Sequence, residues 1–228
     1  VAGFSILLKP NGVATFEFPH LLKLVNENQF DTIYHEHFSY LSLTALETIF
    51  KENGLQIFDV EEHTTHGGSL RLFAQRSDTG VQVVSGQVTE LRKREIDAGM
   101  NSDNFYKNFQ EKANIVKDDL LNFLIKAKQD GKKVVAYGAA AKGNTLMNYA
   151  GIRSDLLSYV VDRSPSKQGK YMPGSRIPIH TEQFLKNDKP DYVLILPWNL
   201  KNEVIKQLSY IQVNGGNFVV AVPKLEII

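Results

Sequence analysis

Apolar residues recur with two different periods, and the period changes partway along the chain. Up to about residue 78, some short runs alternate between apolar and polar residues, which is typical of strands with one buried face. The strands expected there are Val13–Phe18, Leu55–Val60 and Ser69–Ala74. The helices expected there are residues 3–9 and residues 43–53, with Thr44 as the N-cap of the second.

Beyond residue 100 the apolar residues indicate helices that alternate with buried strands. From Ser102 to Asp130 they fall three and four positions apart, which predicts one long helix that ends at Gly131. Strands are expected at 133–137, 157–161, 192–196 and 218–222, and helices from the 138–145 loop to about 150, at 181–187 and at 200–212. Strands that alternate with helices predict a parallel, doubly wound sheet, so the fold class is α/β.

Composition excludes several classes of protein. The 228 residues carry a net charge of +1 and no large basic cluster, which argues against nucleic acid as the main partner. No apolar run is long enough to span a membrane. The chain has no cysteine, so it has no thiolate metal site, and we expect a cytoplasmic protein. It opens without Met on Val1–Phe4, and we expect further sequence upstream.

The stretch from Asp31 to Tyr40 holds the densest group of proton-transfer side chains, including Tyr34, His35, Glu36 and His37. A histidine beside a carboxylate suits general acid–base catalysis. Two other interpretations stay open. The histidines could be buried with both nitrogens bonded, or they could bind a metal.

A metal site would join two pairs of histidines from separate loops. His35 and His37 would share one face of an extended strand, and His63 and His66 could supply further ligands. No spacing among them matches a familiar zinc helix.

The loop Gly138–Thr145 lies between an expected strand and an expected helix. Backbone N–H groups and the helix dipole make such a turn an anion site. Gly138 and Gly143 have the spacing of a nucleotide-triphosphate loop, but Asn144 stands where its lysine should be. The middle glycine of the dinucleotide pattern is also absent. Gly138, Lys142, Gly143 and Asn144 are therefore candidates for binding the phosphate of a nucleotide-linked ligand; alternatively the loop is a packing turn with Lys142 in solvent.

A third loop, His63–Arg71, joins two expected strands. Its two consecutive glycines permit close backbone approach, and Ser69 and Arg71 could bind hydroxyls or phosphate. We therefore add His66, Gly67, Ser69 and Arg71 to the candidate substrate-binding residues. The alternative is a hairpin loop with an exposed arginine.

These three motifs, in the order in which they occur along the chain, resemble those of the nucleotide-sugar C-methyltransferase family, and the resemblance covers nearly the whole chain. The order of elements up to residue 78, with the turn Leu7–Val13, resembles the second half of a class I S-adenosylmethionine-dependent methyltransferase domain. The resemblance implies an incomplete methyltransferase sheet at 1–78, a linker with some helix at 79–101, and a small Rossmann-like nucleotide-sugar-binding domain at 102–228. One departure is Ala140, where the family has proline.

The resemblance also implies a reaction. Members of this family methylate a ring carbon next to a ketone in a deoxysugar bound to a nucleoside diphosphate, and the methyl group comes from S-adenosylmethionine. By analogy His37 is the base, Glu36 orients it and Tyr34 donates a hydrogen bond to the sugar. The cofactor site would lie mostly outside this chain, which would be inactive alone, and zinc would be confined to the family's separate cysteine-rich N-terminal domain.

Two other functions remain open at this point. The chain could be a nucleotide-sugar-binding module without catalysis, because the cofactor half is not present. It could also be a metal-dependent hydrolase that uses its clustered histidines.

Overall fold

The chain folds as two units, and each unit is assembled from two separate stretches of sequence. The computed structural model describes all residues from Val1 to Ile228. The first unit contains residues 1–27 and 38–109, and the second contains residues 28–37 and 110–228. The motif Tyr34–His37 therefore counts with the second unit, although the chain before residue 28 and after residue 37 belongs to the first.

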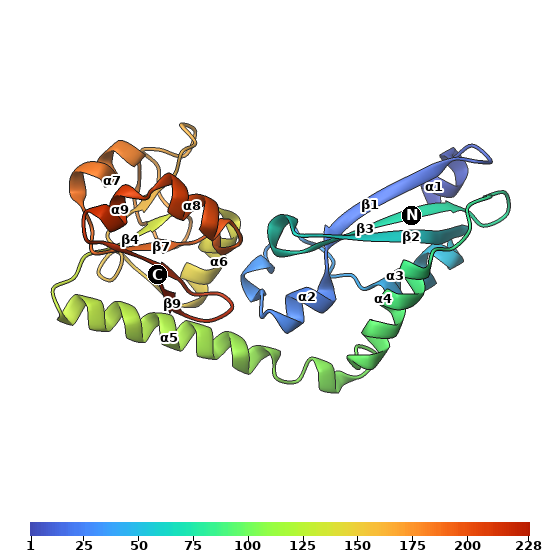
Figure 1. Ribbon diagram of the computed structural model, residues 1–228, viewed down its shortest axis with the longest axis horizontal. Helices are drawn as coiled ribbons and strands as arrows, with labels where there is room; N and C mark the ends of the chain where they lie inside the picture. Colours follow the sequence, from blue (N-terminus) through green and yellow to red (C-terminus); the bar gives the residue numbers. More distant parts are fainter. The chain divides into compact units, whose positions relative to one another are not determined.

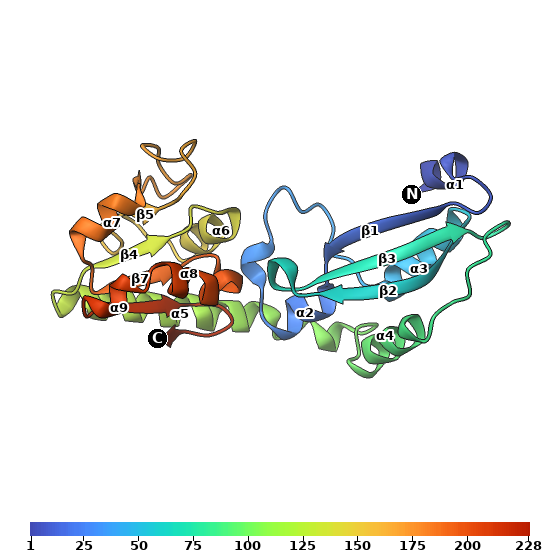
Figure 2. The ribbon, with the colours of Figure 1, turned by 45° about the horizontal axis from the view of Figure 1, so that its top comes forward.

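The first unit is an antiparallel sheet with helices packed on one face (Figures 1 and 2). Its strands are β1 (Val13–Pro19), β2 (Leu55–His63) and β3 (Ser69–Arg76), in the order β1-β3-β2. Its helices are α1 (Ala2–Leu7), α2 (Leu21–Asn26), α3 (Leu43–Glu52) and α4 (Gly86–Asp97), with the 3₁₀ turns η2 (Thr65–Gly67) and η3 (Asp103–Phe105). The central strand β3 pairs with both neighbours, and a bulge at residues 57–59 interrupts its pairing with β2.

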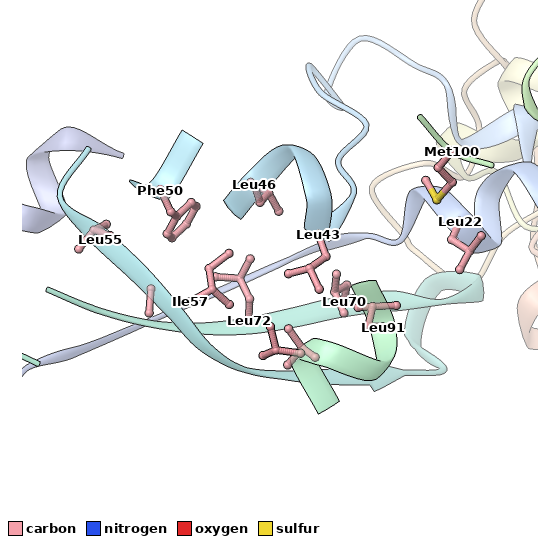
Figure 3. Packing of buried hydrophobic residues seen from close by; sticks show 13 residues of the cluster. Leu22, Leu43, Leu46, Phe50, Leu55, Ile57, Leu70, Leu72, Leu91 and Met100 are labelled. Carbon is pink, nitrogen blue, oxygen red and sulfur yellow. The ribbon is translucent and has the colours of Figure 1, made fainter. Parts of the chain in front are cut away.

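Alternation along β3 builds the core of the first unit (Figure 3). Leu70, Leu72 and Ala74 are fully buried, because every second side chain of a strand points to the same face of the sheet. They pack in one cluster with residues of α3 and α4, including Phe50 and Leu91. The opposite face of β3 carries Ser69, Arg71 and Gln75, together with the ring of Phe73.

The second unit is built around a mostly parallel sheet. Its strands are β4 (Val134–Tyr137), β5 (Val160–Val161), β6 (Ile179–His180), β7 (Tyr192–Ile195), β8 (Asn217–Val220) and β9 (Glu226–Ile227). Its helices are α5 (Phe109–Gln129), α6 (Ala141–Tyr149), α7 (Glu182–Asp188), α8 (Lys201–Gln207) and α9 (Tyr210–Val213), with the 3₁₀ turns η1 (Phe30–Thr32) and η4 (Trp198–Leu200). No helix is long and apolar enough to cross a membrane.

The strand order in this sheet is β6-β5-β4-β7-β8-β9, and only β9 is antiparallel. The chain moves outward from β4 to β6 and then returns to place β7 on the other side of β4. Ligands of open α/β sheets bind where the order reverses in this way, beyond the carboxyl ends of the two central strands. The α/β fold class and the doubly wound order are thus confirmed, and the order indicates the edge of the sheet where a site belongs.

The expected helix from Ser102 to Asp130 is too long at its N-terminal end. Residues 103–105 form η3, and α5 begins at Phe109. Phe105 packs against the core of the first unit, and the Tyr106 hydroxyl donates to the carbonyl of Met100 at 3.0 Å. Phe105 continues the apolar period of α5 but belongs to another core, so the helix could not extend through it.

Three other local predictions differ from the structure. Ser42, not Thr44, caps α3, because its hydroxyl accepts the N–H of Ala45 at 3.2 Å. The helix expected at residues 200–212 is divided into η4, α8 and α9. The strand expected at residues 157–161 is confined to 160–161, and the elements α2, β6 and β9 were not predicted at all.

Removal of the buried Glu95 carboxylate should destabilise the first unit. Its oxygens accept the N–H groups of Leu43 and Thr44, both at 2.8 Å, and the Thr44 hydroxyl at 2.6 Å, so they satisfy the N-terminus of α3. We expect Glu95→Ala to lower the free energy of unfolding by about 2–3 kcal/mol, since it leaves buried donors without acceptors. Urea unfolding measures this change. The exposed Glu90→Ala on the same helix is the control, and an equal effect of both would contradict the role of Glu95.

Candidate functional site

The ten residues from Asn28 to His37 form a short segment that belongs to the second unit. Its 3₁₀ turn η1 is buried at Phe30, Asp31 and Thr32, and the chain then becomes exposed at His35 and Glu36. The ring of Phe30 lies 5.3 Å from that of Tyr149 at the end of α6. One turn of the segment is thus part of the core, and the histidine motif follows directly from it.

A polar cluster connects this turn to the end of strand β7. The indole Nε1–H of Trp198 donates to Asp31 Oδ2 at 2.7 Å, and Asp31 is completely buried. The Lys142 ammonium lies over the Trp198 ring at 4.4 Å and donates to Asn199 Oδ1 at 3.0 Å. Lys142 is itself buried, which excludes the alternative in which it is solvated.

Burial dominates the electrostatics of this cluster. It raises the pKa of Asp31 to about 6, and the Trp198 hydrogen bond and the charge of Lys142 only partly offset this effect. Burial also lowers the pKa of Lys142, against the attraction of Asp31. Oδ1 of Asp31 has no hydrogen-bond partner. The Asp31 carboxylate therefore accepts one strong hydrogen bond, from Trp198, and its other oxygen accepts none.

The imidazole of His37 has a defined orientation. Its Nδ1 lies 2.9 Å from the carbonyl oxygen of Thr32. A carbonyl can only accept, so Nδ1 carries the proton, and in the neutral ring Nε2 holds the free electron pair. The Tyr34 ring lies 4.2 Å from that of His37 at an interplanar angle of 34°. The backbone carbonyl of Thr32 thus orients the imidazole, a role that the resemblance gave to Glu36. The role of Glu36 stays a prediction.

The loop between β4 and α6 comes very close to the end of β7. Gly138 has φ of 94°, and a Cβ there would lie 2.5 Å from Cδ of Pro197. A Cβ on Gly143 would lie 2.6 Å from Cβ of Leu196. Ala140 is the N-cap of α6 and offers no side-chain acceptor, so the first N–H groups of the helix remain for a ligand.

The segment and the loop together line one pocket of the second unit, with a volume of about 390 Å³. Its lining residues are Tyr34, His35, Ala139, Ala140, Ala141, Asn144, Thr145, Ser166, Lys167, Lys170, Tyr171, Met172, Pro173 and Ile179. Two candidates from different motifs, Tyr34 and Asn144, therefore meet in one cavity. His35 lines it as well, whereas His37, to which the resemblance gives the role of base, is not among the lining residues.

Lys167 is the cation of this pocket whose position is best defined. Its ammonium donates to the carbonyl of Ala139 at 2.8 Å and to Asp162 Oδ2 at 3.2 Å. Asp162 also accepts the N–H of Ala139 at 2.8 Å, so it holds the loop in place. An ammonium has three donors, and one remains for a ligand.

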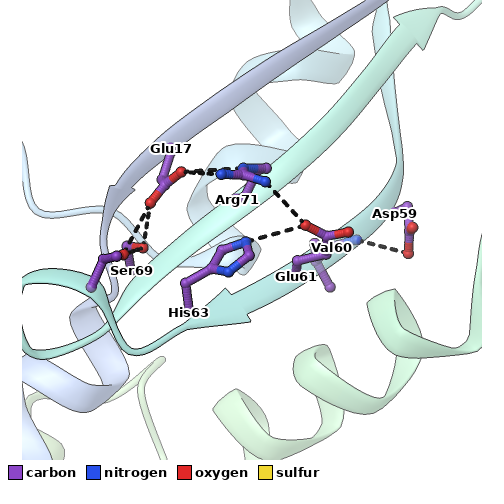
Figure 4. A network of polar contacts seen from close by, with 8 residues as sticks. Glu17, Asp59, Val60, Glu61, His63, Ser69 and Arg71 are labelled. Atoms are coloured by element: carbon purple, nitrogen blue, oxygen red, sulfur yellow. Dashed lines mark hydrogen bonds and ion pairs between the residues drawn. The ribbon is translucent and has the colours of Figure 1, made fainter.

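The third motif lies in the first unit, on the face of the sheet opposite the core (Figure 4). Glu17 on β1 accepts the Ser69 hydroxyl at 2.6 Å and the Arg71 guanidinium at 2.8 Å, and Arg71 also pairs with Glu61 on β2. These contacts, that of Ser69 first, lower the pKa of Glu17 to about 2. Ser69 and Arg71 are thus already bonded within the sheet, and a ligand would have to compete with Glu17 for them.

His66 and Gly67 of the same motif form η2 at the tip between β2 and β3. Both have positive φ, 55° for His66 and 95° for Gly67. The substrate-binding role of these two residues and of Ser69 and Arg71 stays a prediction.

The four histidines of the metal hypothesis are divided between the units: His35 and His37 belong to the second, and His63 and His66 to the first. His63 pairs with Glu61 at 3.1 Å. No group of three or more histidine, aspartate or glutamate side chains is placed to hold a metal ion. The structure therefore adds no support to a histidine metal site.

Sequence reasoning missed the residues that hold the pocket in shape. Asp31, Trp198 and Asn199 carry no recognisable motif, and Lys167 and Tyr171 lie in a stretch without periodicity. One signal was available for Trp198. It is the only tryptophan and follows the strand that reverses the sheet order, where side chains face the ligand crevice.

The second unit thus has a Rossmann-like architecture, with a pocket at the turn after its first strand. A family model for the C-methyltransferase C-terminal domain matches residues 64–223. The chain therefore belongs to this family of C-methyltransferase domains.

A curated relative covers almost all of the chain. Over 226 residues, 99% of this chain, it is 37% identical to the C-methyltransferase NovU of Streptomyces niveus. The alignment covers 54% of NovU, so the chain spans about half the length of that relative. These matches confirm the C-methyltransferase resemblance that the three motifs indicated, while the substrate stays a prediction.

The ionisation of Asp31 should destabilise the fold at neutral pH. Its pKa of about 6 in the folded state exceeds the ordinary 3.8, so the native state binds this proton more tightly than the unfolded state. Stability from this group is greatest below about pH 4 and is lost as the pH rises through 6. We expect Asp31→Asn, which keeps an acceptor for Trp198, to raise the free energy of unfolding at pH 7.5 by about 1–3 kcal/mol.

Denaturant unfolding of wild type and Asp31→Asn at several pH values measures this difference, and other titrating groups cancel between the two proteins. The difference should close near pH 4. A variant less stable than wild type at pH 7.5 would show that attraction to Lys142 outweighs the cost of burial.

Proposed function

We propose that the chain is part of an S-adenosylmethionine-dependent C-methyltransferase, and that its substrate is a nucleoside-diphosphate deoxysugar. Methylation would occur at a ring carbon next to a ketone. The observation that carries this proposal is the pocket that joins Tyr34 to the anion-binding turn at Ala139–Asn144. Family membership and the similarity to NovU support the reaction class.

The pocket has the groups that a nucleotide sugar requires. The N-terminus of α6, which no side chain caps, suits the oxygens of a diphosphate, and Lys167 and Lys170 add positive charge beside it. Tyr171 lines the same pocket and is largely exposed, so its ring is available to a nucleobase or a sugar face. The lining contains both apolar and charged side chains, as is usual in small-molecule sites.

The chemistry proposed for His37 is removal of a proton from the carbon beside the ketone. In the tautomer described above, Nε2 accepts that proton, and the electron pair of the broken C–H bond moves into an enolate. The Tyr34 hydroxyl would donate to the enolate oxygen as its charge develops. The resulting imidazolium would keep its Nδ1–H bond to Thr32, and Glu36 would add negative charge nearby.

When bound, S-adenosylmethionine would supply the methyl group: the enolate carbon would bond to the methyl carbon as its bond to the sulfonium sulfur breaks, with S-adenosylhomocysteine as the leaving group. We expect its site mostly in the half of the relative's length that this chain does not span, because the sequence has no glycine-rich cofactor loop of that type. Zinc enters the proposal only through the family's separate N-terminal domain.

A nucleotide-sugar-binding module without catalysis is the second candidate. The same pocket favours it, because binding needs only the residues of the second unit. Titration of this chain with thymidine diphosphate and, separately, S-adenosylmethionine measures each affinity. Binding of the diphosphate alone fits both candidates, and the methyl-transfer assay below decides between them. Failure to bind any nucleoside diphosphate would refute both.

Asn144→Asp should weaken diphosphate binding. Asn144 lines the pocket, and the substitution keeps its shape while it adds a negative charge beside the anion. We expect at least about a tenfold loss of affinity for thymidine diphosphate in calorimetric titration, since like charges a few ångströms apart repel strongly in a partly buried site. Asn187→Asp on α7 makes the same chemical change on an exposed helix and should bind like wild type.

His37→Ala should reduce methyl transfer by about 10²–10⁴-fold, the usual contribution of a positioned base. The assay uses a fusion of this chain to the half of NovU that the alignment does not cover. It follows methylation of nucleotide-linked keto-sugars. Diphosphate affinity should change little, because His37 does not line the pocket. Transfer within tenfold of wild type would remove His37 from the role of base.

A further inference from the structure

We propose that Asp31 is a positioning residue: from its anchor on Trp198 it fixes the orientation and tautomer of His37 through the backbone of Thr32. The catalytic meaning of this role rests on the proposed function. The arrangement itself does not, because it consists of contacts within the second unit. Three steps connect the anchor to the imidazole.

The first step is the anchor. Asp31 and Trp198 are separated by 167 positions in the chain, yet the indole N–H reaches the carboxylate at 2.7 Å. The indole cannot move freely, because the Lys142 ammonium lies over its ring and is held by Asn199. Trp198 itself directly follows Pro197, which packs closely against Gly138. The carboxylate of Asp31 is therefore bound to a fixed point at the switch in strand order.

The second step is the 3₁₀ turn η1, which contains both Asp31 and Thr32. The Thr32 hydroxyl donates to the carbonyl of Gln29 at 2.8 Å, and the Thr32 N–H donates to the same carbonyl at 3.1 Å. The N–H of Ile33 donates to the carbonyl of Phe30 at 3.0 Å. These bonds make one stiff turn with Asp31 at its centre, so the anchor determines where the Thr32 carbonyl points.

The third step is the bond from His37 Nδ1–H to that carbonyl, at 2.9 Å. The peptide oxygen selects one tautomer, and Nε2 is left as the base. In many enzymes a carboxylate next to the histidine has this task. Here the carboxylate lies one residue further away, and a backbone carbonyl stands between.

The burial of Asp31 also indicates a role beyond stability. Oδ1 has no partner, and an ionisable group buried in this way is disfavoured relative to a neutral isostere. Natural proteins place such locally unfavourable groups mainly at functional sites. The cluster is also continuous with the pocket, because Lys142 and Asn144 lie on the first turn of the same helix.

Nuclear magnetic resonance of the imidazole nitrogens in this chain tests the inference without any substrate. The His37 signals are assigned by comparison with His37→Gln. Wild type should show Nδ1 protonated and Nε2 unprotonated at high pH. Asp31→Ala and Trp198→Phe should both shift His37 toward the mixture of tautomers of a free side chain. Trp198→Phe keeps an aromatic ring under Lys142, so it removes little besides the N–H donor.

Asp31→Asn is the conservative rescue, because its amide oxygen still accepts from Trp198. It should keep the wild-type tautomer. Tyr159→Phe is the matched control: it removes another buried hydrogen bond of the second unit, from the Tyr159 hydroxyl to Asp188 at 2.8 Å. It should leave the signals of His37 unchanged. A general loss of stability would affect the control as well as the anchor variants.

The kinetic readout uses this chain joined to the half of NovU that the alignment does not cover. Asp31→Ala should lower kcat by about 10–100-fold with KM for the nucleotide sugar nearly unchanged, as is typical when a group behind a catalytic residue is removed. Asp31→Asn should restore most of this activity.

Folded Asp31→Ala and Trp198→Phe that both keep the wild-type tautomer of His37 would overturn the inference. If Asp31→Ala does not fold, Trp198→Phe decides alone. A shifted tautomer in a protein that shows no methyl transfer under any condition would support the positioning role and refute the proposed function, so the two failures can be distinguished.

Discussion

The hydrogen bond between the Trp198 indole and the Asp31 carboxylate determines where most of the remaining site can lie. A carboxylate removed from water requires donors with a fixed geometry, and the indole is one that cannot rotate away once Lys142 covers its face. The turn η1 is thereby fixed to the carboxyl edge of the sheet. The orientation of His37 and the wall that Tyr34 adds to the pocket follow from it.

The strand order explains why this edge is the one in use. When β7 returns to the other side of β4, the loops after both strands diverge and leave room between them. In many α/β proteins a ligand alone fills this room. Here the turn η1 of the chain itself also packs at this edge. The remaining pocket is bounded by the start of α6 and by Lys167. The protein thus provides part of the site from a segment distant in sequence.

How far the sequence could predict this arrangement depended on the physical character of each residue. The β-branched runs of β4, β7 and β8 predict buried strands, and the position of the loop after β4 makes it a candidate anion-binding turn. Asp31 could not be found in this way, because an aspartate in a polar stretch reads as exposed, and only the distant Trp198 makes its burial possible. Phe105 misled for the opposite reason: it matches the period of α5 but packs in another core. The strands β6 and β9 are two residues long and have no period to detect.

The membership of residues 28–37 in the second unit has a consequence for synthesis and dissection of the protein. A ribosome releases this segment before it has made any other part of the unit to which it belongs, and Trp198 emerges more than 160 residues later. The pocket wall can therefore close only late, after a large loop entropy has been overcome. Cleavage of the chain at residues 109–110 would give a C-terminal piece that keeps its sheet but has an open core where η1 belongs. Neither half of a simple cut would contain the site.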